Sequence, residues 1–181
     1  NDIKKGMSGK LPNVYVLHGD LTPEEMNGLY SHPKVKAHIS FTKGEGFGRP
    51  LLEASISGKP VIASGWSGHV DFLNKYGIGI PGELKNVHKS AVWKDVIIPE
   101  SKWFYANYGY AGGILQDVVT NYKKYCETTR KQTKFVKDNF TISKMNEEFV
   151  KLINKYVPEF PKQVELKLPK LKLPNLEKQN V

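Results

Sequence analysis

The stretch from Gly44 to Glu53 constrains the fold more than any other part of this sequence, because it sets a glycine-rich turn between a strand pattern and a helix pattern. Before it, residues 35–41 form an apolar run that predicts a strand. After it, residues 51–57 predict the first turns of a helix, and Pro50 suits the first turn because its missing N–H has no partner there. The sequence therefore predicts a strand-to-helix junction with little side-chain bulk at the turn.

A junction of this kind favours a bound anion. The first N–H groups of a helix have no intrahelical partner, and the aligned peptide dipoles leave partial positive charge at that end. Gly46 and Gly48 carry no Cβ, so the phosphates of a ligand can approach the backbone closely. Glu45 precedes the turn, and Glu53 lies about one turn inside the helix, about 5 to 6 Å along its axis. Because carboxylates accept hydrogen bonds from sugar hydroxyl groups, this pattern predicts a diphosphate flanked by two sugars, which is the layout of a nucleotide sugar.

The sequence Glu45-Gly-Phe-Gly-Arg-Pro-Leu-Leu-Glu53, followed by Gly58-Lys-Pro-Val-Ile-Ala-Ser64, resembles the E-x7-E motif of retaining glycosyltransferases of family 4. The similarity is strong over residues 35–72 and weaker over the rest of residues 11–156. That family has the GT-B fold, in which two Rossmann-like domains face a cleft, and the motif lies in the C-terminal, donor-binding domain. The resemblance implies an α/β fold with a Rossmann-like parallel sheet flanked by helices, the C-terminal half of a GT-B glycosyltransferase.

The resemblance also implies a role for each residue of the motif. It implies that Glu45 is the catalytic residue and contacts the donor sugar, that the amides of residues 46–48 bind the diphosphate, and that Glu53 holds the ribose. The loop after the first predicted strand is expected to touch the base. The nucleotide-sugar-binding residues expected on this basis are Gly46, Phe47, Gly48, Arg49, Leu52, Glu53, Gly19 and Leu21. No metal and no cofactor is expected, because GT-B enzymes generally use helix dipoles and basic side chains where other enzymes use a divalent ion.

The reaction implied by the resemblance is transfer of a hexose from a UDP-, GDP- or ADP-linked donor to an acceptor hydroxyl, with retention of the anomeric configuration. The donor domain of the family begins with a strand, a Gly-Arg turn and a nearby Lys, and this chain starts beyond that point at Asn1. We therefore expect it to lack the first strand and helix of the domain, and also the N-terminal acceptor-binding domain that is its partner. The isolated fragment is expected to be inactive without that partner.

Two other functions remain open. One is a nucleotide-sugar-binding module without catalytic turnover. The other is a basic protein that binds polyanions or a membrane surface, since the formal net charge is +9. The basic residues of the second half follow amphipathic helix patterns, so we expect them on solvated helix faces and expect no nucleic-acid partner. They are Lys123, Lys124, Arg130, Lys131, Lys134 and Lys137.

Cysteine content and hydropathy favour a cytoplasmic protein. Cys126 is the only cysteine, so no internal disulfide is expected and a reducing compartment is the default. No apolar stretch of the sequence approaches the roughly 20 residues that a membrane-spanning helix needs. The net positive charge leaves peripheral contact with an acidic membrane surface open.

Strand and helix patterns alternate along the first half of the chain, which predicts a parallel sheet. The predicted strands are Val14–Leu17, Ala37–Phe41, Pro60–Ala63 and Gly77–Ile80, and the predicted helices between them are Pro23–Tyr30, Pro50–Ser57 and His69–Asn74. Residues 86–107 predict a long aromatic loop in which Trp93 and Trp103 pack on the core rather than on a ligand. His69 is expected either to contact donor or acceptor or to cap the helix at its start.

The second half of the chain predicts helices and then a segment of a different kind. The expected helices cover Ala111–Glu127, Arg130–Asn139 and Ser143–Tyr156. From Pro158, prolines and alternating lysine and leucine residues predict an extended arm, which is either a disordered linker or a strand laid on another surface. These patterns divide the chain into a nucleotide-sugar-binding Rossmann-like domain, residues 1–157, and an extended tail, residues 158–181.

Overall fold

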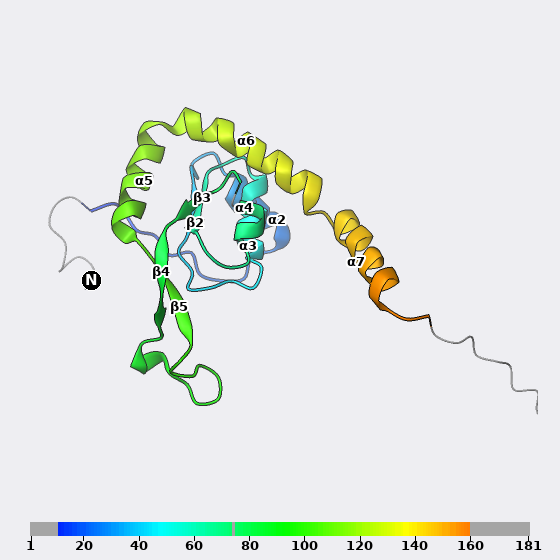
Figure 1. The fold of residues 1–181 in the computed structure, drawn as a ribbon. Coiled ribbons are helices and arrows are strands. Elements are labelled where there is room, and N and C mark those ends of the chain that lie inside the picture. The colour runs from blue at the N-terminus through cyan, green and yellow to red at the C-terminus, as the bar shows by residue number, and fades with distance from the viewer. Residues whose placement is uncertain (1–10, 74, 160–181) are drawn as a thin grey trace, which may run out of the picture. The chain divides into compact units, whose positions relative to one another are not determined.

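A three-stranded parallel sheet lies within the first of two units into which the chain divides, residues 1–141 and 142–181 (Figure 1). The computed structural model describes residues 11–73 and 75–159. The strands of the sheet are β1 (His38–Ser40), β2 (Val61–Ser64) and β3 (Ile78–Ile80), in the order β1-β2-β3. The helices described in the first unit are α2 (Pro23–Ser31), α3 (Arg49–Ile56), α4 (Val70–Leu73), α5 (Tyr108–Thr120) and α6 (Tyr122–Asn139). The predicted α/β class and the parallel pairing are confirmed.

Strand β2 is buried on both faces and divides the core into two clusters. Its successive side chains point to opposite sides, so Val61 and Ala63 pack with residues of α3, α4 and α6. Ile62 packs on the other side, with residues of β3 and α5. All four residues of β2 are buried, as is typical of a strand in a parallel sheet that helices cover on both faces. Because β2 is covered on both faces, a ligand can approach this strand most directly at its ends.

Helices α2 and α3 lie against each other; α2 starts at the predicted residue, and α3 starts one residue earlier than predicted. Helix α2 begins with a capping box, in which the Thr22 hydroxyl accepts from the Glu25 N–H at 3.2 Å and the Glu25 carboxylate accepts from the Thr22 N–H at 2.8 Å. At the other end of α2, the Lys59 ammonium donates to the Tyr30 carbonyl at 2.7 Å. Lys59 lies two residues before the start of β2, so this bond fixes the end of α2 against the sheet.

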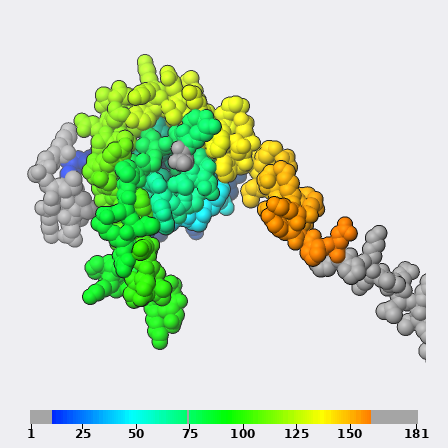
Figure 2. Space-filling model, in the orientation of Figure 1, coloured from blue at the N-terminus to red at the C-terminus, as the bar shows by residue number. Residues whose placement is uncertain are grey.

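A β-hairpin replaces the long loop predicted for residues 86–107, and that prediction is wrong. Strands β4 (Gly82–Asn86) and β5 (Lys102–Ala106) pair antiparallel, and their connection contains a 3-10 turn, η1 (Lys89–Ala91). Neither an apolar alternation nor a short turn signal marks this hairpin, because β4 is exposed along its whole length and the connection is long. Figure 2 shows the hairpin standing out from the body of the first unit.

The two tryptophans of the hairpin differ in environment. Trp93 is 67% exposed, so its predicted packing on the core is wrong. It lies in the connection between β4 and β5, and its backbone pairs with that of Ile97. Trp103 lies in β5 and is half-buried. Of these two tryptophans, only Trp103 therefore has a partly packed side chain.

Two further predictions of secondary structure are wrong. Residues 14–17 form no strand, and their side chains are 68% to 87% exposed. A β-branched run makes a strand only where a partner strand is present, and in the described part of the chain β1 pairs with β2 alone. The break between α5 and α6 falls at Asn121 rather than after Glu127. Asn121 leaves the helical conformation there, with φ −110° and ψ 33°, and its side-chain amide donates to the Asp117 carboxylate at 2.7 Å.

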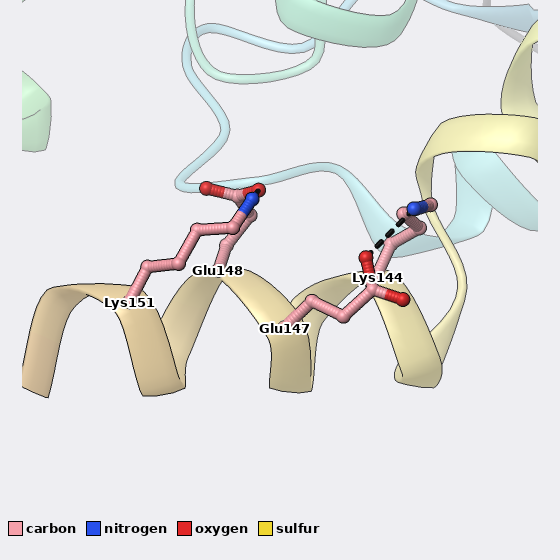
Figure 3. Close-up of polar contacts among 4 residues, drawn as sticks. All are labelled: Lys144, Glu147, Glu148 and Lys151. Carbon is pink, nitrogen blue, oxygen red and sulfur yellow. Dashed lines mark hydrogen bonds and ion pairs between the residues drawn. The ribbon is translucent and has the colours of Figure 1, made fainter. Parts of the chain in front are cut away.

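The second unit contains helix α7 (Ile142–Tyr156), whose predicted start is one residue later. Ion pairs occupy its polar face, Lys144 with Glu147 at 2.7 Å and Lys151 with Glu148 at 2.6 Å (Figure 3). The apolar residues repeat at helical spacing along the opposite face, and their side chains are exposed. They are Ile142, Met145, Phe149, Leu152, Ile153 and Tyr156.

Three expectations concern surfaces and the tail. The basic residues named above are all exposed on α6, so their predicted position on a solvated helix face is confirmed. In the described part of the chain, no helix combines the length and the apolarity needed to cross a membrane. The tail predicted from Pro158 falls mostly on residues 160–181, outside the described residues, and stays a prediction.

Candidate functional site

The turn predicted to bind an anion connects β1 to α3, at the edge of the sheet where the parallel strands end. Gly48 is the N-cap of α3 and has φ +82°, a left-handed conformation that glycine adopts without steric cost. A Cβ on Gly48 would also lie 2.8 Å from the Cβ of His69. The backbone of the turn therefore packs on His69 too closely for any side chain at this position.

The peptide N–H groups of this turn are available to a ligand. Those of Gly46, Phe47, Gly48 and Arg49 donate to no acceptor within residues 11–73 and 75–159. Helix α3 is eight residues long, and its dipole adds partial positive charge at the same end. Unpaired N–H groups at the start of a helix form the arrangement that binds phosphate groups in many proteins.

Glu45 is held by its backbone and leaves its carboxylate unpaired. The Ser67 hydroxyl accepts a hydrogen bond from the Glu45 N–H at 2.9 Å and donates one to the Glu45 carbonyl at 2.7 Å. The Gly68 N–H donates to the same carbonyl at 3.1 Å. The Glu45 side chain is half-buried and forms no hydrogen bond or ion pair with any described residue. A carboxylate that is positioned but unpaired can accept hydrogen bonds from the hydroxyl groups of a ligand.

Glu53 lies one turn inside α3 and pairs with Arg49, whose Nε lies 2.7 Å from Glu53 Oε1. By accepting this hydrogen bond, the Glu53 carboxylate raises the pKa of Arg49. The Arg49 side chain is 81% exposed, so the pair is a surface ion pair and contributes little to stability. Its local effect is to fix one carboxylate oxygen, while Oε2 has no partner among the described residues.

A pocket of about 280 Å³ opens between α2 and α3, on the side of the turn where Glu53 lies. Its walls bring together three predicted site residues, Leu21, Arg49 and Glu53. The other lining residues are Pro23, Met26, Asn27, Tyr30 and Ile56. Burial and then the charge of Glu53 raise the pKa of Tyr30, so its hydroxyl is a hydrogen-bond donor in this pocket. The pocket thus combines apolar walls with a few polar groups, which is the usual composition of a small-molecule site.

The remaining predicted site residues lie elsewhere. Gly19 is exposed and does not line this pocket. Leu52 packs against the core cluster that surrounds β2. The Phe47 ring lies 5.4 Å from the Phe72 ring and 6.4 Å from the Phe140 ring, so its side chain belongs to an aromatic cluster. At Phe47 and Leu52, therefore, the backbone rather than the side chain is the part that could contact a ligand at the turn.

His69 is a buried structural residue. Its side chain is 1% exposed, and its Nε2 donates to the carbonyl of Ser64 at 2.6 Å. This hydrogen bond connects the end of β2 to the start of α4, and the His69 side chain packs against Gly48. The predicted contact of the His69 side chain with a ligand is wrong, because the hydrogen bond to Ser64 holds the ring inside the protein. The segment does precede α4 as predicted, and the His69 carbonyl accepts from the Leu73 N–H at 3.0 Å.

Trp66 and Ser67 flank the site, although sequence reasoning assigned neither a role. They lie in the segment Gly65-Trp-Ser-Gly68, which directly follows β2. In a parallel sheet, segments that follow neighbouring strands meet at the same edge. From this rule, the position of residues 65–68 beside the Glu45 turn could have been predicted from the sequence.

Sequence comparisons provide no relative on which a function could be based. No protein-family model matches the chain, and no curated protein matches it. The functional assignment therefore depends on the geometry of the turn, the two carboxylates and the pocket.

Proposed function

We propose that this chain is the donor-binding domain of a retaining glycosyltransferase of the GT-B type. One observation carries the proposal: the unpaired N–H groups at the start of α3 lie between the Glu45 loop and the Glu53 pocket. A nucleotide sugar has its groups in the matching order, with the hexose and the nucleoside on opposite sides of the diphosphate. The resemblance to the E-x7-E motif supports the same order.

In this proposal the diphosphate rests on the turn formed by residues 46–48. The free N–H groups and the dipole of α3 stabilise its negative charge, and Arg49 adds a cation at the edge of the turn. During transfer, negative charge grows on the departing diphosphate, and preorganised donors of this kind stabilise it more strongly than mobile water does.

The nucleoside is assigned to the pocket between α2 and α3. Glu53 Oε1 is held by Arg49, so Oε2 can accept hydrogen bonds from the ribose hydroxyl groups. Leu21 and Met26 offer apolar contacts to the base, and Asn27 offers an amide that can donate and accept hydrogen bonds.

Glu45 is assigned to the hexose. Its backbone is fixed by Ser67, and its unpaired carboxylate can orient the sugar hydroxyl groups and support positive charge at the anomeric centre. We assign it no role as a covalent nucleophile. Transfer also needs an acceptor site, which we expect the second Rossmann-like domain of a GT-B enzyme to supply.

The proposal can be tested by calorimetric titration of the full chain with UDP, GDP, ADP and their glucose derivatives. Three variants are compared with the wild type: Glu45→Gln, Glu53→Gln and, as a matched control, Glu127→Gln on the exposed surface of α6. Loss of a hydrogen bond to a charged group costs about 1.5–3 kcal/mol, or about 10- to 100-fold in affinity.

We expect Glu53→Gln to weaken the binding of both nucleotides and nucleotide sugars. Glu45→Gln is expected to weaken only the ligands that carry a sugar, and Glu127→Gln to change neither. Equal affinities of all four proteins for every ligand would remove the site assignment. Tighter binding of unrelated polyanions than of nucleotide sugars would favour the basic polyanion-binding alternative.

A further inference from the structure

Trp66 stands between the hairpin and the Glu45 turn. Its indole stacks on the ring of Phe104 in β5, with centroids 5.9 Å apart and planes inclined by 7°. On the side of the turn, a Cβ placed on Gly44 would lie 3.3 Å from Cζ3 of Trp66. Trp66 therefore contacts both the hairpin and the residue that precedes Glu45.

The hairpin is bonded to the same turn. The Phe104 N–H donates to the carbonyl of Lys43 at 3.0 Å, and the Lys43 ammonium lies 3.5 Å from the centroid of the Tyr105 ring. The Gly65 N–H donates to the carbonyl of Ile80 at the end of β3, at 2.8 Å. The backbone on either side of Trp66 is thus anchored, by Gly65 to the end of β3 and by Ser67 to Glu45.

Part of Trp66 remains accessible to solvent. Phe104 is 6% exposed and stacks on one face of the indole, whereas Trp66 as a whole is 37% exposed. The residue after Trp66, Ser67, holds the backbone of Glu45. An accessible aromatic side chain therefore adjoins the residue that holds the backbone of Glu45, and the Glu45 carboxylate has no partner among the described residues.

An aromatic face beside a carboxylate matches the chemistry of a hexose. A pyranose ring has an apolar C–H face, which packs on an aromatic plane, and equatorial hydroxyl groups at its rim, which donate to a carboxylate. We propose that Trp66 is a specificity-determining residue that stacks on the sugar of the donor, with Phe104 and the hairpin as its support. This inference rests on the proposed function and adds a named subsite to it.

The first experiment keeps Trp66 and removes the other tryptophans. The chain has three, so Trp93→Phe and Trp103→Phe together make Trp66 the sole tryptophan emitter. UDP-, GDP- and ADP-glucose are titrated into this variant, and so are the matching nucleoside diphosphates. We expect the bound nucleotide sugar to change the Trp66 emission and the bound diphosphate to leave it unchanged.

The second experiment measures affinity by calorimetry for Trp66→Phe, Trp66→Leu and the control Trp93→Leu. Loss of an aromatic contact predicts about 2- to 10-fold weaker binding of the nucleotide sugar to Trp66→Leu. Binding of the nucleoside diphosphate should not change. Trp66→Phe should retain part of the affinity, and Trp93→Leu all of it.

The outcomes separate this inference from the proposed function. If the nucleotide sugar leaves the Trp66 emission and the Trp66→Leu affinity unchanged while Glu53→Gln still weakens nucleotide binding, Trp66 only packs, and the inference fails alone. If the wild type binds neither nucleotides nor nucleotide sugars, both proposals fail together.

Discussion

The hydroxyl of Ser67 closes a two-bond clamp on the backbone of Glu45, accepting from its N–H at 2.9 Å and donating to its carbonyl at 2.7 Å. Ser67 has φ +90°, which is rare for a residue with a side chain and is strained. The two hydrogen bonds offset that strain. The backbone of the residue that carries the proposed catalytic carboxylate is therefore held by a turn that lies 22 residues further along the chain.

Ser67→Ala removes both bonds of the clamp but keeps a Cβ at the strained position. We expect it to lower the free energy of unfolding by about 1–3 kcal/mol, measured by urea denaturation. Ser67→Gly removes the same bonds and relieves the backbone strain, so it should be destabilised less. Both variants should bind nucleotide sugars more weakly. Equal stability of Ser67→Ala and the wild type would show that the clamp contributes nothing.

Gly68 and Gly46 make a matched pair for substitution by alanine, because the added methyl group would meet different surroundings at the two positions. A Cβ on Gly68 would overlap the carbonyl oxygen of Gly46, whereas a Cβ on Gly46 meets nothing within 4 Å. We expect Gly68→Ala to destabilise the protein by several kcal/mol or to prevent its folding, because the two loops must separate. Gly46→Ala should unfold within about 1 kcal/mol of the wild type. Thermal unfolding followed by circular dichroism measures both, and comparable melting temperatures would contradict the packing of these two loops.

Tyr125 and Asp117 join α6 to α5 and predict a pH dependence. The Tyr125 hydroxyl donates to the Asp117 carboxylate, which raises the pKa of Tyr125 to about 12 and lowers the pKa of Asp117. The unfolded tyrosine ionises near pH 10, so the stabilisation is present below pH 10 and is lost as the pH rises towards 12. For Asp117 the sign is opposite, and stability falls as the pH drops below about 4.

Urea denaturation of the wild type and Tyr125→Phe between pH 3 and 11 tests this pair. The difference in unfolding free energy between the two proteins should be largest near neutral pH and should shrink at both ends. Tyr108→Phe is the control, because Tyr108 is 61% exposed. A difference that stays constant with pH would contradict the assigned hydrogen bond.

The junction of β1 and α3 could be predicted from sequence because its signals are local. Glycines, Pro50 and the flanking apolar runs each act within a few residues, and the structure places the turn where they indicate. The parallel pairing followed from the alternation of elements. The clamp from Ser67 and the stacking of Trp66 could not be predicted this way, because they depend on which loops meet at the edge of the sheet.

The wrong predictions of secondary structure have a similar physical origin. Residues 14–17 have the composition of a strand, but a ladder needs a second strand to supply hydrogen-bond partners, and composition does not reveal one. Strand β4 has no apolar alternation, and it forms because β5 pairs with it across a long connection. Asn121 interrupts the helical pattern by its backbone conformation, which the run of apolar positions did not reveal.

Helix α6 supplies the last prediction, because it holds α3 and α4 at points remote from the proposed ligand. The Thr133 hydroxyl donates to the carbonyl of Ser55 at 2.8 Å, and the buried Gln132 side chain donates to the carbonyl of Phe72 at 2.6 Å. Gln132→Leu leaves a buried carbonyl unpaired and should lower the free energy of unfolding by about 1–3 kcal/mol, and Thr133→Val by about 1 kcal/mol. Neither bond touches the turn at the start of α3, so the affinity of the folded variants for nucleotide sugars should equal that of the wild type. Urea denaturation and calorimetry measure the two quantities separately. A loss of affinity in a variant that is still folded would mean that the position of α3, and with it the geometry of the turn, depends on α6.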